Sequence, residues 1–131
     1  MSVAYEQDTY YRFSPFAKNW IATSGIMNHC QRNQCFWVLD TLASYVPTLA
    51  RTQGVDYFLI VQVEVNPDQT AVFTIQQEEH DEEGNTGYRT LVKQDLDYTD
   101  LNASWKFWAI NETSGAYDPA CQTVVLLPEE Y

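Results

Sequence analysis

The fold is decided by residues 57–77, which read YFLIVQVEVNPDQTAVFTIQQ. Two runs rich in β-branched and aromatic residues, Tyr57 to Val65 and Ala71 to Gln77, have the composition of β-strands. Between them stands Asn66-Pro67-Asp68, whose residue types are typical of a turn. This arrangement predicts a β-hairpin.

Further strands are expected after this hairpin. The segment Gly84-Asn85-Thr86-Gly87 supplies residues that accept turn torsions, so a second loop is expected there. Short strand patterns follow at residues 88–95, 104–110 and 123–127. With the first hairpin they predict an antiparallel sheet of about five strands.

The region before the hairpin has a helical pattern. Apolar residues recur at three- and four-residue spacing over residues 35–46, which predicts a central helix lying in the core. Ser24 can cap a shorter helix before it, and Pro47 is expected to end the central helix. Helices followed by strands indicate the α+β class, with the N-terminal helices packed on one face of the sheet.

The length of 131 residues predicts one domain, residues 1–131, that needs no metal or disulfide to stabilise its core. Cys30, Cys35 and Cys121 are too few for a secreted disulfide framework and favour free thiols. No apolar run approaches the ~20 residues of a membrane span, and the N-terminus lacks a secretion signal. We therefore expect a soluble cytoplasmic protein, in the host cytoplasm if a phage encodes it.

Negative charge is concentrated in the middle of the chain. The formal net charge is -11, and residues 64–100 hold ten acids against Arg89 and Lys93, a balance of -8. The densest part is residues 78–83, where five carboxylates surround His80. Such a charge repels polyanions and attracts cationic surfaces, which argues against direct binding of nucleic acid.

These acids define a predicted partner-binding surface. Side chains on one strand face recur only every ~6.6 Å, so a single acidic strand is too dilute to imitate DNA, and two or more rows would have to converge. Alternation places Asp95 and Asp97 on one face, where Glu64 and residues 78–83 could extend the surface across neighbouring strands. Simple solvation of a charged loop is the competing interpretation. The predicted partner-binding residues are Glu78, Glu79, Asp81, Glu82, Glu83, Asp95 and Asp97.

No catalytic residue, metal site or cofactor is predicted. His29-Cys30 and Cys35 are zinc-ligand types, but four residues separate the cysteines and Cys35 opens an apolar helix, so core packing is favoured. His80 lies among acids that favour its charged form, which suits a charge neutraliser better than a catalytic base. Nucleophile-elbow, phosphate-loop and two-histidine metal motifs are absent from the sequence, so we expect a protein that is not an enzyme.

A second interpretation is a small-molecule or nucleotide-derivative binding domain. Nine Tyr, six Phe and four Trp could supply an aromatic pocket at Trp37, with Tyr11, Arg12 and Asp40 as its polar contacts. The structural alternative for Asp40, which interrupts an apolar helix, is that it reaches solvent or meets a donor such as Arg12 or Tyr11. Exposed aromatic residues would also favour a homodimer.

Five short fragments of the sequence point to a known family when they are taken together. They are Tyr10-Tyr11-Arg12, Thr23-Ser24-Gly25, Phe36-Trp37-Val38-Leu39-Asp40, Tyr98-Thr99-Asp100-Leu101 and Leu127-Pro128-Glu129-Glu130-Tyr131. Their order resembles a family of small uncharacterised bacterial and phage proteins, a domain of unknown function. In that family an aromatic-Trp-Leu-Leu/Ile-Asp helix, a Tyr-Thr-Asp turn and a Leu-Pro-x-Glu-Tyr ending recur. The chain departs from it at Phe13, where His is usual, in the acidic run 78–83 and in the extended stretch 111–120.

Charge, the lack of catalytic motifs and the resemblance together favour an acidic, non-enzymatic interaction protein of phage or mobile-element type. It would bind a basic protein surface on a nucleic-acid-handling or defence complex, such as a CRISPR effector. By occupying that surface it would block nucleic-acid access, as an anti-CRISPR inhibitor or DNA mimic does. Charge complementarity with Lys and Arg would guide the binding, and no membrane is involved.

Overall fold

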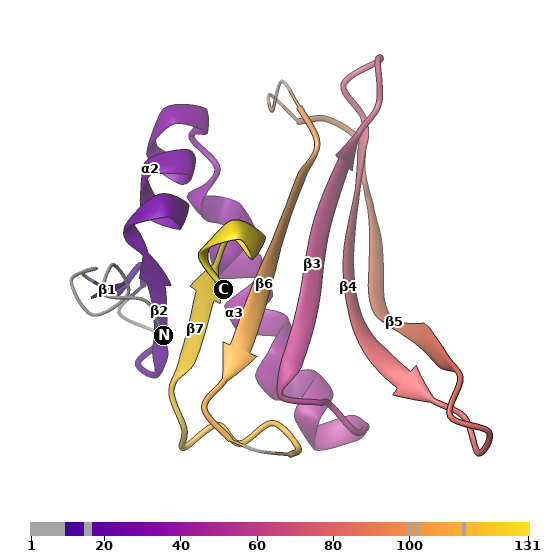
Figure 1. Cartoon of the computed structure of the whole chain (residues 1–131). Helices are drawn as coiled ribbons and strands as arrows, with labels where there is room; N and C mark the ends of the chain where they lie inside the picture. The colour runs from indigo at the N-terminus through magenta and orange to yellow at the C-terminus, as the bar shows by residue number, and fades with distance from the viewer. Residues whose placement is uncertain (1–9, 15–16, 100, 102, 114) are drawn as a thin grey trace.

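The computed structural model describes residues 10–14, 17–99, 101, 103–113 and 115–131. Within them, helices and one seven-stranded mixed sheet form an α+β fold (Figure 1). The helices are α2 (Ser24–Asn33), α3 (Phe36–Thr52) and a short 3-10 helix, η1 (Pro128–Glu130). The strands are β1 (Tyr10–Tyr11), β2 (Trp20–Thr23), β3 (Phe58–Val65), β4 (Ala71–His80), β5 (Thr86–Leu96), β6 (Trp105–Asn111) and β7 (Thr123–Leu126).

The sheet has the strand order β1-β2-β7-β6-β3-β4-β5. All neighbouring strands are antiparallel except β2 and β7, which are parallel. The predicted class is confirmed, and the five expected strands correspond to β3 through β7. The sheet is larger and mixed because β1 and β2 join it, and these strands of two and four residues are too short to show an alternating pattern.

The helix boundaries differ from the predicted ones at two residues. The N-cap of α2 is Thr23, whose hydroxyl accepts a hydrogen bond from the backbone N–H of Ile26 at 3.3 Å, so Ser24 is already the first helical residue. The expectation that Pro47 ends the central helix is wrong, because α3 continues through it to Thr52. Leu49 and Ala50 still pack against the core beyond the proline, and this packing outweighs the lost backbone hydrogen bond.

The core lies between the helices and one face of the sheet. Val38, Leu39, Leu42 and Val46 of α3 are fully buried, and Figure 1 shows α3 running across that face. The facing strands contribute every second residue, which gives the pattern predicted for strands with one buried face. These strand residues are Leu59, Val61, Val63, Phe73, Ile75, Phe107 and Ala109.

The opposite face of the sheet carries a cluster of aromatic rings. Phe58 and Trp108 lie 5.0 Å apart between ring centroids, and Tyr131 meets them edge to face at 6.1 and 5.5 Å. Figure 1 shows η1 in front of the sheet and α3 behind it, so the C-terminal residues partly cover this second face. Tyr131 nevertheless remains 78% exposed.

The C-terminal segment is attached to the N-terminus of α2 through Glu130. One oxygen of its carboxylate, Oε1, accepts hydrogen bonds from the Thr23 hydroxyl at 2.7 Å and from the Leu127 backbone N–H at 2.9 Å. A Cβ atom at Gly25 would lie only 2.8 Å from the other oxygen, Oε2, so glycine permits the approach. The first turn of α2 has no acid of its own, and Glu130 supplies the negative charge favoured there.

Candidate protein-docking surface

The acidic residues 78–83 form the tip of the β4–β5 hairpin. The two strands pair from Ala71 with Leu96 as far as His80 with Thr86. Every residue from Glu78 to Thr90 is exposed. Figure 1 shows this tip extending away from the body of the sheet at one edge. The prediction of a loop at residues 84–87 is therefore close, since the turn lies between His80 and Thr86.

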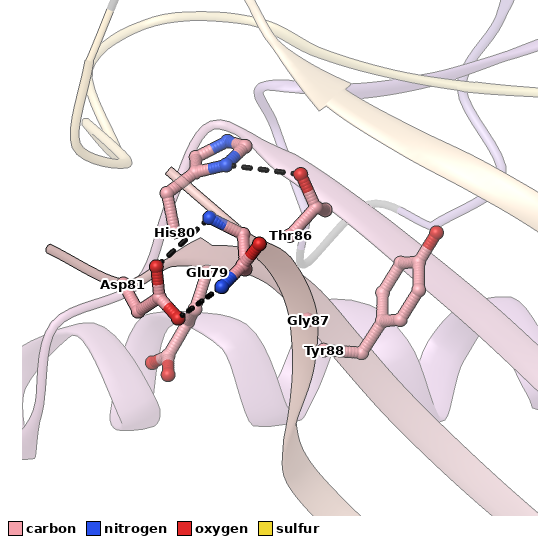
Figure 2. A pocket seen from close by; sticks show the side chains of 7 residues that line it. Glu79, His80, Asp81, Thr86, Gly87 and Tyr88 are labelled. Carbon is pink, nitrogen blue, oxygen red and sulfur yellow. Dashed lines mark hydrogen bonds between the residues drawn. The ribbon is translucent and has the colours of Figure 1, made fainter. Parts of the chain in front are cut away.

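Asp81 holds the turn in a defined shape (Figure 2). Its carboxylate accepts hydrogen bonds from the backbone N–H groups of Asn85 at 2.8 Å and Glu83 at 2.9 Å, and from the Asn85 side-chain amide at 3.1 Å. These bonds, first of all those from Asn85, hold the pKa of Asp81 below its ordinary value. Gly84 adopts a φ of 84°, a left-handed conformation that favours glycine. Asp81 therefore serves the turn, whereas Glu82 and Glu83 remain exposed on it.

Glu78 and Glu79 lie on opposite faces of the hairpin and have different surroundings. Because side chains alternate, Glu78 lies on the open face of the sheet, while Glu79 shares the helix-facing side with the buried Gln77. Glu79 is 3.5 Å from Arg89 and is the one acid in the described part of the chain that forms a salt bridge. Among the described residues, the other acids of the tip have no base within salt-bridge distance.

Two contacts fix the hairpin to the body of the protein. Arg89 donates a hydrogen bond to the side-chain oxygen of Gln53, just after α3, at 2.8 Å. The backbone N–H of Asp56 donates to the side-chain oxygen of Gln77 at 2.9 Å. These anchoring residues were not predicted from the sequence. Alternation in β4 indicates that Gln77 faces the core, but only the register of the hairpin places Arg89 opposite it.

An open hollow of about 290 Å³ lies beside the turn. At this hollow the Nδ1 atom of His80 is 3.1 Å from the Thr86 hydroxyl, and Figure 2 shows the Tyr88 ring apart from this pair. The lining combines one imidazole with carboxylates and amide groups, a composition suited to polar contacts with a partner. The lining residues are Glu79, His80, Asp81, Asn85, Thr86, Gly87 and Tyr88.

Asp95 and Asp97 are not brought to the tip. Asp95 lies near the other end of β5, about 30 Å away at ~3.4 Å per residue, and Asp97 follows the strand. Val72 pairs with both Glu64 and Asp95, so these two acids share the open face two strands apart. The seven predicted residues therefore form two groups, one at each end of β5, and the continuous acidic surface expected from the sequence is not formed.

The residues of the predicted aromatic pocket are also separated. Trp37 lines an open hollow of about 210 Å³ with Leu96, Tyr98 and Thr99. Tyr11, Arg12 and Asp40 are all exposed and are not part of its lining. Of the two outcomes expected for Asp40, the structure shows the solvent-exposed one.

His29 and the cysteines of the N-terminal helices are packed into the protein. Cys30 and Cys35 are buried free thiols, and the Cys30 thiol lies 3.7 Å from the Cys35 carbonyl oxygen. The interaction of its thiol with the Cys35 side chain, followed by burial, raises the pKa of Cys30. His29 stacks on Trp105 with ring centroids 4.1 Å apart. Burial, followed by the charge of Arg32, lowers the pKa of His29. In the part of the chain that the structure describes, no three or more His, Cys, Asp or Glu side chains are grouped to hold a metal ion.

Membership of a family follows from a sequence comparison. A family model described as a family of unknown function, DUF6876, matches residues 2–131. The chain belongs to the DUF6876 family. This confirms the resemblance to an uncharacterised family, and DUF6876 carries no assigned activity. No curated protein and no solved structure gives a significant match to the sequence.

Two of the sequence fragments behind the resemblance meet in space. Thr23-Ser24-Gly25 and the C-terminal segment from Leu127 to Tyr131 join where Glu130 contacts Thr23 and Gly25. These fragments therefore build the fold of this DUF6876 protein and lie apart from the hairpin tip.

Among the described residues, none of the helices is long and apolar enough to cross a membrane.

Proposed function

We propose that this DUF6876 protein is a non-enzymatic, acidic interaction protein that docks on a basic protein surface. Its docking element is the tip of the β4–β5 hairpin. The observation that carries the proposal is a fully exposed acidic turn that is held in shape by Asp81 and fixed to the body through Arg89. A turn that is already ordered loses little conformational entropy on binding. The docking residues are Glu78, Glu79, Asp81, Glu82 and Glu83.

Charge explains the choice of partner. Four of the five docking carboxylates have no base within salt-bridge distance among the described residues, so their mutual repulsion is relieved when a Lys- or Arg-rich surface approaches. Long-range attraction of this kind speeds association and is screened beyond ~8 Å at physiological salt. Binding should therefore weaken as ionic strength rises.

The partner we favour is a host complex that handles nucleic acid or provides defence, such as a CRISPR effector. A protein of phage or mobile-element origin that covers its basic surface would block nucleic-acid access. The hairpin tip places five acids within six positions, which is denser than the acids on one face of an extended strand. It suits a basic cleft that holds a few phosphates better than a long groove for duplex DNA.

The test is an affinity capture from host cells at low and high salt. The tip variant carries Glu78→Gln, Glu79→Gln, Glu82→Gln and Glu83→Gln, and leaves Asp81 in place to preserve the turn. A control removes the same charge from exposed acids away from both ends of β5, through Asp40→Asn, Glu64→Gln, Glu112→Gln and Glu129→Gln. We expect a basic protein that the control retains, that the tip variant loses, and that nucleic acid displaces.

Two results would contradict this proposal. Equal loss with both variants would show that only total charge matters, and salt-independent binding that survives in the tip variant would show that the acids do not mediate it.

The alternative is binding of a small molecule or nucleotide derivative in the hollow beside Trp37. Its support is the aromatic wall formed by Trp37 and Tyr98. A thermal-shift screen with a metabolite library tests it. A genuine ligand would raise the melting temperature of the wild-type protein and have no effect on Trp37→Ala.

A further inference from the structure

β5 is the edge strand of the sheet and the longest strand in the described part of the chain. It spans Thr86–Leu96 and, among those residues, pairs only with β4. Figure 1 shows β5 at the border of the sheet with no helix beyond it. Its outward N–H and C=O groups are therefore available to pair with another strand.

The two acidic groups lie at the two ends of this edge. The hairpin tip precedes Thr86, and Asp95 and Asp97 mark the other end about 30 Å away. Between them stands Lys93, while Arg89 is engaged with Glu79 and Gln53. An extended segment lying along β5 would thus have carboxylates near both of its ends and a lysine near its middle.

We propose that the β5 edge binds an extended segment of the partner by β-strand addition, and that this segment carries Lys or Arg at both ends with neutral strand-forming residues between. The inference rests on the proposed basic partner and specifies how it is held. Backbone hydrogen bonds would supply affinity along the strand. The charges at the two ends would set the register of the added segment.

A second copy of this chain fits the edge poorly. Antiparallel pairing of two β5 strands would place each acidic tip beside Asp95 and Asp97 of the other copy, and parallel pairing would place tip beside tip. Both arrangements bring like charges together between chains of formal net charge -11.

The experiment uses the full chain and synthetic peptides of about eleven residues, the length of the edge. The first peptide has two lysines at each end and alternating Val and Thr between. The second has the same composition with its four lysines in the middle. Two further versions of the first peptide carry N-methyl groups on alternate residues, either the odd or the even ones, and so lose one set of backbone donors. Binding is measured by calorimetry, and contact by hydrogen exchange of the Thr86–Leu96 amides.

We expect the end-charged peptide to bind about tenfold more tightly than the centre-charged one, a difference of about 1.4 kcal/mol. One N-methylated version should lose about tenfold in affinity and the other should not, because only alternate N–H groups of an added strand face β5. Exchange of β5 amides should slow in the complex. Equal binding of the two N-methylated versions, or unchanged exchange in β5, would overturn the inference.

The two proposals fail in different ways. If the tip variant loses its cellular partner and no peptide protects β5, docking through the tip stands and strand addition is wrong. If peptides protect β5 and the cellular partner binds the tip variant as well as the wild-type protein, strand addition stands and the proposed function is wrong.

Discussion

Carboxylates toward the two edges of the sheet differ in their hydrogen bonding and exposure. Glu130 is half-buried, accepts two hydrogen bonds and closes the C-terminal segment on α2. Glu82 and Glu83 are exposed on the hairpin tip, where no base neutralises them among the described residues. The hydrogen bonds of Glu130 contribute to the stability of the fold, and no such contribution is seen for Glu82 and Glu83. We therefore expect the hairpin tip to have a role outside the fold.

The largest effect is expected from breaking the partnered carboxylate. Glu130→Ala leaves the Thr23 hydroxyl and the Leu127 N–H without their acceptor, and we expect it to lower the free energy of unfolding by about 1–3 kcal/mol. Urea unfolding followed by tryptophan fluorescence measures it. Glu129→Ala, an exposed neighbour, is the control and should change little. Equal effects of both substitutions would contradict the structural role of Glu130.

A substitution at Gly25 tests the same contact more sharply, because its effect on the free energy of unfolding should change sign when the Glu130 side chain is removed. Alanine normally stabilises a helix relative to glycine by up to about 1 kcal/mol. In the wild-type background, Gly25→Ala should instead destabilise by about 1 kcal/mol, because its Cβ would lie 2.8 Å from a carboxylate oxygen held in place. In a Glu130→Ala background the same substitution should stabilise. A double-mutant cycle measures the coupling, and additive effects would show that the two residues are independent.

His29, a titratable group that is partly buried, unlike those of the exposed hairpin tip, should make the stability of the protein depend on pH. Its pKa is lowered by burial in the folded protein, so the neutral form is favoured there. The unfolded chain takes up the proton first, near pH 6.5, and stability should fall as pH decreases from that value through the folded-state pKa. His29→Phe keeps a ring on Trp105 and should remove this part of the pH dependence. Identical profiles of stability against pH for the wild-type protein and His29→Phe would exclude this contribution of His29.

The smallest effect is expected at the tip. Glu82→Gln with Glu83→Gln should change the free energy of unfolding by no more than about 0.5 kcal/mol, as is usual for surface substitutions. The direction should be stabilising at low salt, because like charges no longer repel, and the difference should vanish near 0.5 M salt, an ionic strength of the order that screens such charges. A clear loss of stability would mean that these glutamates support the fold.

Local patterns were sufficient to predict much of the sheet. Strands β3, β4 and β6 follow alternation that can be seen within a few residues, and the core helix follows a three-to-four spacing. β1 and β2 depend on partners instead: β2 pairs with β7, which lies a hundred residues later in the chain. The passage of α3 through Pro47 likewise depends on packing against the sheet, which no local rule contains.

The candidate site was predictable in composition and only partly in arrangement. Charge density identified the hairpin tip directly, because adjacent residues in a turn remain adjacent in space. The distance from the tip to Asp95 depends on strand register, and the role of Asp81 depends on the shape of the turn. The contact between Thr23 and Glu130 joins residues 107 positions apart, so only the folded chain reveals it.

The parallel pairing of β2 with β7 sets an order for folding during synthesis. On the ribosome, β3 through β6 can associate as antiparallel neighbours while translation continues. Trp20 and Ala22, both buried in the finished protein, must wait in the nascent chain for the last strand to emerge. β2, which is translated early, is therefore among the last strands to join the sheet.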